Sequence, residues 1–381
     1  MKYRVGEICD VVSGGTPSRA TAEFWDGGTI PWIKIGNIQR KYVDEADEYI
    51  TQAGLEGSSA KMLSAGTILF TIFATLGEVG ILTIEACTNQ AIAGITIKNQ
   101  SDILTDYLYY FLKSQKSCIA ALGRGVAQNN INLSILRNFE VPIPDLPMQK
   151  QIVAILDKTA KVVEVRQQQL QQLDELVKAR FVELFGDGNH PHIALIDLII
   201  EGAGLSYGIV QPGDDGTGDM GVLRPVDMVD GKISTASIKY IDRSIGDGFK
   251  KTELYGDELL ITVRGTTGIT ALTDIRFNGM NVTRGIAVVR YDRNKINPVY
   301  LNAYLNTDES QRYIQEHTRG ATLQQINLSD LRVQQIMVPP LALQEQMAAF
   351  IEQTDKSKSV VQKALDEAQL LFDSLMQQYF G

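Results

Sequence analysis

Histidine and cysteine side chains, which supply many nucleophiles and metal ligands, are few and scattered in this chain. The histidines are His190, His192 and His317, and the cysteines are Cys9, Cys87 and Cys118. None of them has the short repeated spacing of a zinc site. An odd number of cysteines, without an apolar leader-like segment at the start, favours a reducing, cytoplasmic setting over a disulfide framework. We therefore expect no metal site.

Two motifs of nucleotide chemistry are also missing. No GxxxxGK[ST] phosphate loop occurs, so ATP hydrolysis is not expected. An amino-methyltransferase would need an Asn-Pro-Pro-aromatic motif, and the nearest string, Asn297 to Tyr300, lacks the second proline. That string begins a predicted helix and is interpreted as a helix start. The sequence thus predicts a chain without a catalytic centre.

Composition sets the next limits. The chain has 381 residues, 44% of them hydrophobic, which is enough for packed cores. No window approaches the roughly 20 apolar residues that span a bilayer, so no membrane is expected. The net charge of −9 argues against a strongly basic surface. Nucleic acid, if bound, would need local clusters of cations or a partner that grips the phosphates.

An internal repeat decides the predicted architecture. RGVAQNNINLS at 124–134 returns as RGATLQQINLS at 319–329, and the offset of 195 holds without a gap to the end. Residues 123–186 and 318–381 share 21 identities in 64 pairs. In each copy a proline-containing link precedes a long segment without glycine. A repeat of this kind indicates two copies of one structural unit.

Each long segment predicts a helix of about 36 residues, or about 54 Å. Apolar residues alternate at four and three positions, which is a heptad seam. We expect an antiparallel coiled coil whose core is Leu156, Val163, Leu170, Leu173, Val177, Ile351, Val361, Leu365, Phe372 and Leu375. Arg166 and Lys358 interrupt the seam and would extend to water or pair across it. The alternative is that each helix packs only on its own domain.

The segments before the repeats read as two mixed α/β heads. Their apolar, β-rich runs are predicted at 30–35, 67–73, 79–84 and 91–97, and again at 221–224, 259–263, 269–272 and 285–289. A helix follows each set, at 102–113 and near 298–305. The predicted fold class is α+β with pseudo-twofold symmetry. Its domains are 1–145, 146–186, 187–340 and 341–381.

Several strings resemble one family, the specificity subunits of type I restriction–modification systems. These strings are Gly14-Gly-Thr-Pro-Ser-Arg19, Ile30-Pro-Trp-Ile-Lys-Ile-Gly-Asn37, Asn89-Gln90 and Gly204 to Gly213. Ile131-Asn-Leu-Ser and Ile326-Asn-Leu-Ser, with the links after them, resemble the entry to the family's conserved helix. The resemblance spans the whole chain, and the order of the strings together with the repeat is its most specific part.

The resemblance implies two target recognition domains that each read half of a bipartite double-stranded DNA site. The helices would set the unread gap and dock two modification subunits, which methylate adenine. Restriction subunits would join them. S-adenosylmethionine, ATP and magnesium would belong to these partners, and this chain would bind no cofactor.

The candidate DNA-binding residues are polar and basic side chains in the loops of the two heads. Arg can pair with guanine, and Asn or Gln with adenine, through two hydrogen bonds each. The candidates in head one are Thr16, Ser18, Arg19, Lys34, Asn37 and Gln90, with Arg124 for phosphate. The candidates in head two are Ser206, Tyr207, Gln211, Arg224, Arg264, Thr266, Thr267 and Arg284, with Arg319 for phosphate.

Three alternatives stay open. A fused methyltransferase or nuclease would need a catalytic domain for which the chain has no room. A non-DNA protein–protein scaffold on a coiled coil fits the acidic charge. A recognition subunit that serves a stand-alone methyltransferase keeps the family and changes the system.

Overall fold

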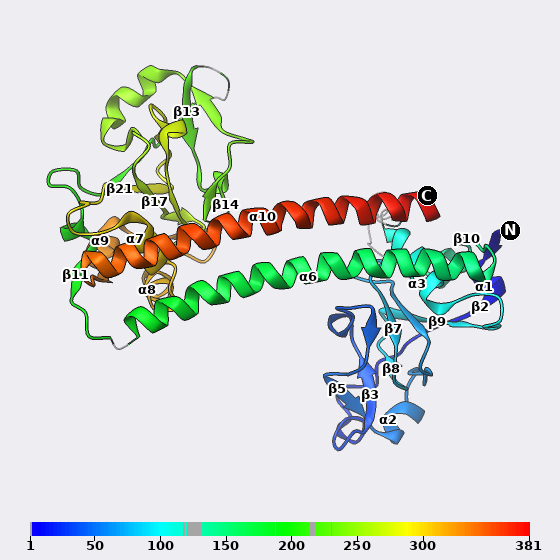
Figure 1. Cartoon of the computed structure of the whole chain (residues 1–381). Helices are drawn as coiled ribbons and strands as arrows, with labels where there is room; N and C mark the ends of the chain where they lie inside the picture. The colour runs from blue at the N-terminus through cyan, green and yellow to red at the C-terminus, as the bar shows by residue number, and fades with distance from the viewer. Residues whose placement is uncertain are drawn as a thin grey trace. The chain divides into compact units, whose positions relative to one another are not determined.

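The computed structural model describes residues 2–116, 119, 131–186, 188–213, 216, 218–229 and 231–381 (Figure 1). Its contacts divide the chain into two units, residues 1–169 with 361–381, and residues 170–360. Each unit holds one head, the first half of one long helix and the second half of the other. The sequence predicted separate domains for the two helices. In the structure the boundary between the two units falls near the middle of each helix, because each head packs on one half of each helix.

Head one is built on two larger sheets, and within its described residues β1 also pairs with β10 in a separate two-stranded sheet. Its five-stranded sheet has the order β2-β9-β6-β7-β4, and its three-stranded sheet has the order β5-β3-β8. The strands are β1 (Lys2–Arg4), β2 (Cys9–Ser13), β3 (Ile30–Ile33), β4 (Tyr42–Val43), β5 (Glu48–Ile50), β6 (Ile68–Thr71), β7 (Val79–Leu82), β8 (Cys87–Thr88), β9 (Ile92–Ile97) and β10 (Glu140–Pro142). The helices are α1 (Val5–Ile8), η1 (Ala22–Phe24), η2 (Ile35–Asn37), α2 (Gln52–Glu56), α3 (Thr105–Ser114) and α5 (Leu133–Arg137).

Head two repeats this plan. Its four-stranded sheet has the order β12-β21-β17-β19, and its three-stranded sheet has the order β16-β13-β20. The strands are β11 (His192–Ala194), β12 (Ser206–Tyr207), β13 (Met220–Leu223), β14 (Met228–Val229), β15 (Lys232–Ile233), β16 (Lys239–Ile241), β17 (Leu259–Thr262), β18 (Arg264–Gly265), β19 (Thr270–Leu272), β20 (Asn281–Val282), β21 (Ile286–Val289), β22 (Gln324–Gln325) and β23 (Gln335–Met337). The helices are η3 (Leu195–Leu198), η4 (Pro225–Asp227), η5 (Arg243–Thr252), η6 (Ile275–Phe277), α7 (Pro298–Leu305), α8 (Asp308–His317) and α9 (Leu328–Val333). The predicted strands and helices of both heads are therefore confirmed.

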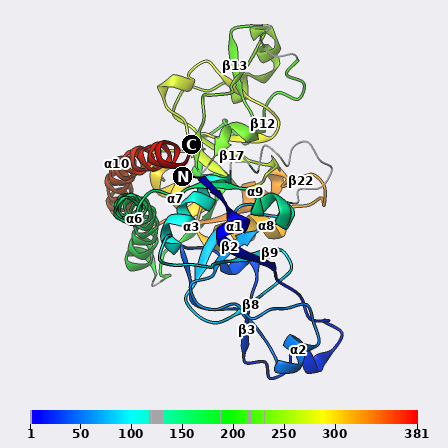
Figure 2. The ribbon, with the colours of Figure 1, turned by 90° about the vertical axis from the view of Figure 1, so that its right-hand side faces the viewer.

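Within each head the smaller sheet forms an outer lobe. In Figure 2, β3, β8 and α2 lie beyond β2 and β9, on the side away from α3. The larger sheet packs on α3 in one continuous core with Ile68, Phe70 and Ile95. This arrangement leaves the loops at the junction of the two sheets open to solvent.

The long helices are α6 (Leu146–Phe185) and α10 (Leu341–Phe380), each of 40 residues. They are longer than predicted because α6 begins ahead of Pro147, and the first turn of a helix tolerates proline. In the second unit they run antiparallel, since Asp174 pairs with Lys358 at 2.6 Å while Arg180 lies over Phe350. Lys358 therefore pairs across the seam, as expected, whereas Arg166 bonds Gln169 of its own helix at 2.7 Å.

The predicted seam is the less exposed face of each helix, although most of it is only half-buried. Leu156 and Phe372 are buried. The other predicted core residues, Val163, Leu170, Leu173, Val177, Ile351, Val361, Leu365 and Leu375, are half-buried. Their neighbours Val162, Leu176 and Leu370 are between 42% and 72% exposed. Leu156 and Phe372 pack in the core of head one, so the assignment of the seam as the core of the helix pair stays a prediction.

Equivalent aromatic contacts fix each head to the end of a helix. Phe380 packs edge-to-face on Tyr107 at 5.3 Å, and Phe185, 195 residues earlier, packs the same way on Tyr300 at 5.3 Å. The two tyrosine hydroxyls donate to main-chain carbonyls 195 residues apart, at Pro142 (2.6 Å) and Met337 (2.9 Å). The sequence repeat is thus a repeat of specific contacts.

A buried glutamine at the start of each helix shows the same equivalence. Gln149 accepts a hydrogen bond from the Leu104 amide at 2.9 Å, and Gln344 accepts one from the Asn297 amide at 2.8 Å. Asn297 also caps α7, accepting from the Val299 amide at 2.9 Å. The interpretation of the Asn-Pro-Val-Tyr string as a helix start is therefore confirmed.

Candidate nucleic-acid interface

In head one, three loops meet where the two sheets join. The Gly15 amide, after β2, donates to Thr88 at 2.8 Å, and the Asn89 amide, after β8, donates to Ile33 of β3 at 3.1 Å. Gly14 is required here because a Cβ on it would lie 2.2 Å from the Thr88 hydroxyl. We call these segments, residues 14–19, 34–37 and 88–91, together with the hairpin turn 72–78, the head-one loop cluster.

Head two brings together the equivalent loops with the same bonds. The Ile209 amide donates to Val282 at 2.8 Å, and the Thr283 amide donates to Leu223 at 2.9 Å. Gly208 takes the place of Gly14, since a Cβ there would lie 2.0 Å from the Val282 carbonyl oxygen. Residues 208–213, 224–227, 282–285 and 263–269 form the head-two loop cluster. Loops with dissimilar sequences therefore occupy equivalent positions.

The head-one cluster holds its cations in internal ion pairs. The Arg19 guanidinium lies over Trp25, 3.6 Å from the ring centroid, and pairs with Glu48. Lys34 Nζ pairs with the same carboxylate at 2.6 Å. Hydrogen bonds from Lys34 and Arg19 lower the pKa of Glu48 below its usual value. This local neutralisation leaves the cluster with little free positive charge.

The neutral candidates of head one lie around these cations. Thr16 donates to Gln90 Oε1, and both residues are exposed. Asn37 is used differently, because its side-chain oxygen accepts from the Lys34 amide at 2.8 Å and caps a short helix. Ser18 is exposed, and its carbonyl accepts from the Trp25 indole at 3.0 Å.

Two arginines of the head-two cluster have no carboxylate partner among the residues that the structure describes. Arg224 is bidentate to the buried Asp227, with bonds of 3.1 and 3.0 Å, and is therefore largely fixed by the scaffold. In contrast, no acidic side chain among the described residues pairs with Arg264 or Arg284. The Val263 and Arg264 amides both donate to Gly285, at 2.8 and 3.3 Å, which brings the backbone of Arg264 beside the turn that carries Arg284.

The remaining candidates of head two differ in their access to solvent. Tyr207, Gln211 and Thr266 are exposed, and Ser206 is half-buried. Thr267 is buried, and its hydroxyl bonds Thr318 at 3.0 Å, so this residue belongs to the scaffold of the cluster. Arg319 is exposed and lies 3.5 Å from Asp330. Arg124 lies outside the described residues.

One exposed residue of the head-one cluster was missed from the sequence. Phe73 is 37% exposed and begins the hairpin turn between β6 and β7. The turn aligns without a gap as TIFATLG at 71–77 and TVRGTTG at 262–268, which places Phe73 opposite Arg264 in the alignment. This short alignment is the signal in the sequence that points to Phe73.

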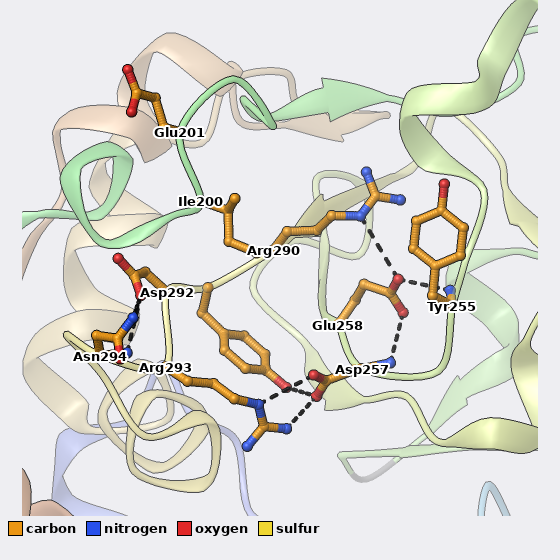
Figure 3. A pocket seen from close by; sticks show the side chains of 10 residues that line it. Ile200, Glu201, Tyr255, Asp257, Glu258, Arg290, Asp292, Arg293 and Asn294 are labelled. Carbon is orange, nitrogen blue, oxygen red and sulfur yellow. Dashed lines mark hydrogen bonds and ion pairs between the residues drawn. The ribbon is translucent and has the colours of Figure 1, made fainter.

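The described parts of the chain hold no group of three or more His, Cys, Asp or Glu side chains placed to bind a metal. A pocket of about 530 Å³ in head two is lined by charged side chains that bond one another (Figure 3). Glu258 accepts from three successive amides between 2.7 and 3.1 Å, and Arg293 pairs with Asp257 at 2.5 Å. Although burial opposes the charge of Asp257, the bonds from Arg293 and Tyr291 lower its pKa, so these wall residues are held mainly by one another.

None of the helices that the structure describes combines the length and the apolar character needed to cross a membrane.

Comparisons with known proteins identify the class. A family model, the type I restriction modification DNA specificity domain, matches residues 1–175 and 219–369. The chain therefore belongs to the family of type I restriction–modification specificity subunits. Members of this family are DNA-recognition components, which agrees with the prediction of a non-catalytic chain.

Individual relatives and structures resemble different shares of the chain. The EcoR124I/EcoR124II specificity subunit of Escherichia coli is 32% identical over 160 residues, which is 40% of this chain and 39% of that protein. The MjaIX specificity subunit of Methanocaldococcus jannaschii is 22% identical over 376 residues, 92% of this chain and 85% of that one. The S subunit of M. genitalium has a similar fold, with a TM-score of 0.59, 15% identity and coverage of 100% and 96%.

Proposed function

We propose that the two loop clusters read the two halves of a bipartite double-stranded DNA site. One observation carries the proposal. Equivalent main-chain hydrogen bonds hold the two clusters in place, but the clusters present different side chains. Two domains that recognise different half-sites require this combination of a common backbone and different side chains. Arg264 and Arg284 add two cations to the head-two loop cluster, and arginines without a described carboxylate partner suit guanine edges or phosphates.

The long helices would set the unread gap and dock two modification subunits. A 40-residue helix is about 60 Å long, which is ample for half-sites separated by about one helical turn, roughly 34–36 Å. Exposed apolar residues along both helices, including Val182, Val360 and Leu370, offer contacts to such partners. A chain from a structure concerning complex assembly of the type I R-M system has a similar fold, with a TM-score of 0.56 and 16% identity.

The net charge of −9 is compatible with a complex in which other subunits contact most of the DNA phosphates. Modification subunits that clamp the duplex would supply most phosphate contacts, while this chain supplies base contacts. The isolated chain should therefore bind DNA weakly and lose that binding steeply with salt. Restriction subunits would add ATP-driven steps, and S-adenosylmethionine would bind the modification subunits.

The test is to co-express the chain with its modification subunits and to sequence methylated adenines in host DNA. We expect a two-part motif with an unread gap that disappears when this chain is omitted. Methylation that persists unchanged without the chain would remove the specificity role and favour a protein–protein scaffold. A motif that needs only a stand-alone methyltransferase would keep the family and change the system.

A second experiment tests the helices. Deletion of residues 160–166 and 365–371 removes one heptad from each helix. The two segments are chosen to lie opposite each other in the antiparallel pair. The helix pair would shorten by about 10 Å, so the gap should shrink by roughly three base pairs while both half-sites stay the same. Removing a heptad from one helix only is the control, and it should abolish methylation by breaking the register of the seam.

A further inference from the structure

The hairpin turns 72–78 and 263–269 have the same hydrogen bonds. Thr71 and Thr262 each close the turn, because their hydroxyls accept from the Glu78 and Ile269 amides at 2.9 Å in both heads. The first residue of each turn, Ile72 or Val263, donates to the strand opposite at 2.8 Å. The second residue is Phe73 in head one and Arg264 in head two, so two side chains of different character, one aromatic and one cationic, occupy one structural position.

The strand register places each turn beside a second loop of its cluster. Thr71 pairs with Ile92, and Thr262 pairs with Ile286. One residue further along, the Ile72 amide donates to Ala91 and the Val263 amide donates to Gly285, each at 2.8 Å. Phe73 and Arg264 therefore follow the points where the turns meet the loops that carry Gln90 and Arg284.

The backbone at this position is strained in head one. Ala74 has a φ of 59°, and it is the only non-glycine residue with a positive φ among the described residues. Head two has Gly265 at the equivalent position, with a φ of 88°, where the same conformation is unstrained. Strained backbone that the surrounding structure maintains is concentrated at functional sites. In head one the turn thus keeps an exposed phenyl ring at the loop cluster despite the strain.

We propose that this position selects one base pair in each half-site, an A·T pair through Phe73 in head one and a G·C pair through Arg264 in head two. The inference rests on the proposed DNA-reading function. An aromatic ring contacts the thymine methyl group, and glutamine pairs with adenine through two hydrogen bonds. Phe73 and Gln90 thus suit the two bases of A·T pairs. Thr16 supports this use of Gln90, because an amide oxygen that accepts from its hydroxyl keeps a second lone pair.

The head-two residues have the opposite preference. Neither Arg264 nor Arg284 pairs with a carboxylate of the described residues. Guanine N7 and O6 are acceptors that an arginine can bind with two hydrogen bonds. Arg264 and Arg284 therefore favour guanine and disfavour the amino group of adenine or cytosine.

The experiment exchanges the two side chains and sequences methylated adenines from cells that carry the modification subunits. With Phe73→Arg, we expect one A·T position of one half-site to become G·C, while the other half-site stays as in the wild type. With Arg264→Phe, we expect the reverse change in the other half-site. In competition binding of the complex, each swap should alter discrimination at that base pair by about 10- to 100-fold.

Milder variants guard against misfolding. Phe73→Ala and Arg264→Ala should relax the same two positions without creating a new preference. Ala74→Gly, which removes the strain and keeps the ring, should leave the motif unchanged. If the truncated variants assemble with the modification subunits and the motif is still unchanged, the inference is wrong, although the wild-type bipartite motif would still support the proposed function. Absence of any motif in the wild type would instead overturn the proposed function.

Discussion

In head one, Glu48 neutralises Arg19 and Lys34, whereas in head two Arg264 and Arg284 have no carboxylate partner among the described residues. Both loop clusters nevertheless use equivalent main-chain hydrogen bonds between equivalent strands. The backbone of a recognition head is therefore set independently of the side chains that its loops carry. Such independence allows one head to change its ligand without a change in the fold.

The largest expected effect tests whether the two attachments of heads to helices are equivalent. Phe185→Ala and Phe380→Ala each remove a ring that packs on a head tyrosine at 5.3 Å. Each should lower the free energy of unfolding by about 3–5 kcal/mol, the usual cost of deleting a buried aromatic ring. Denaturant titration of the full chain measures this cost. Equal losses would support the pseudo-twofold symmetry, and a loss at only one site would show that the two attachments differ in strength.

The next effect contrasts the two clusters on DNA. Arg284→Ala should weaken binding of the assembled complex by about 1–3 kcal/mol and relax one base pair of its half-site. Gln90→Ala, the equivalent change in head one, should cost less, since the bonds that it removes are neutral rather than charge-assisted. Fluorescence anisotropy with DNA altered in one half-site at a time gives both values. A larger cost for Gln90→Ala would contradict the view that head two depends more on charge.

The sequence predicted the repeated parts of the molecule better than the parts that differ. The offset of 195 identified Gln149 with Gln344 and Phe185 with Phe380, because packing and buried hydrogen bonds restrict these residues in both copies. The loops carry no such restriction. Thr267 was nominated as a base contact although it is buried, and Phe73 was missed because a single exposed phenylalanine is unremarkable until its turn is superposed on the other head.

A smaller effect concerns a polar attachment that head one alone possesses among the described residues. Asp157 of α6 accepts from Lys41 and from Tyr110, each at 2.6 Å. Burial lowers the pKa of Lys41, but its bonds to Asp106 and Asp157 outweigh burial and raise it. The residue equivalent to Asp157 is Glu352, and no described residue pairs with it. The head-one attachment therefore has a charged component.

Asp157→Asn should destabilise the chain by about 1 kcal/mol, since the carboxylate is 44% exposed and water screens part of the pair. Glu352→Gln is the matched control and should change the free energy of unfolding by less than about 0.5 kcal/mol. Both are measured by denaturant titration. If the two variants behave alike, the network contributes nothing to the attachment of head one.

The smallest effect tests the neutralisation of head one directly. Glu48→Gln removes the carboxylate that pairs with Arg19 and Lys34, so the isolated chain should bind DNA more tightly at low salt. The slope of the logarithm of the binding constant against the logarithm of the salt concentration should steepen by the equivalent of about one or two phosphate contacts. Arg19→Ala in the same background should remove part of the gain. If Glu48→Gln leaves DNA binding at the wild-type level, these cations do not reach the duplex.

Acid should have a related effect on the stability of the wild type. The pKa of Glu48 is lowered in the folded chain by its bonds to Lys34 and Arg19. Its ion pairs therefore stabilise the fold above the unfolded pKa, near 4.3, and this contribution disappears as pH falls through the lower folded value. The stability difference between the wild type and Glu48→Gln, at most about 1 kcal/mol for such exposed pairs, should be constant above about pH 5 and vanish in acid. A difference that persists in acid would mean that Glu48 acts by packing, and head one would then lack the internal neutralisation that distinguishes it from head two.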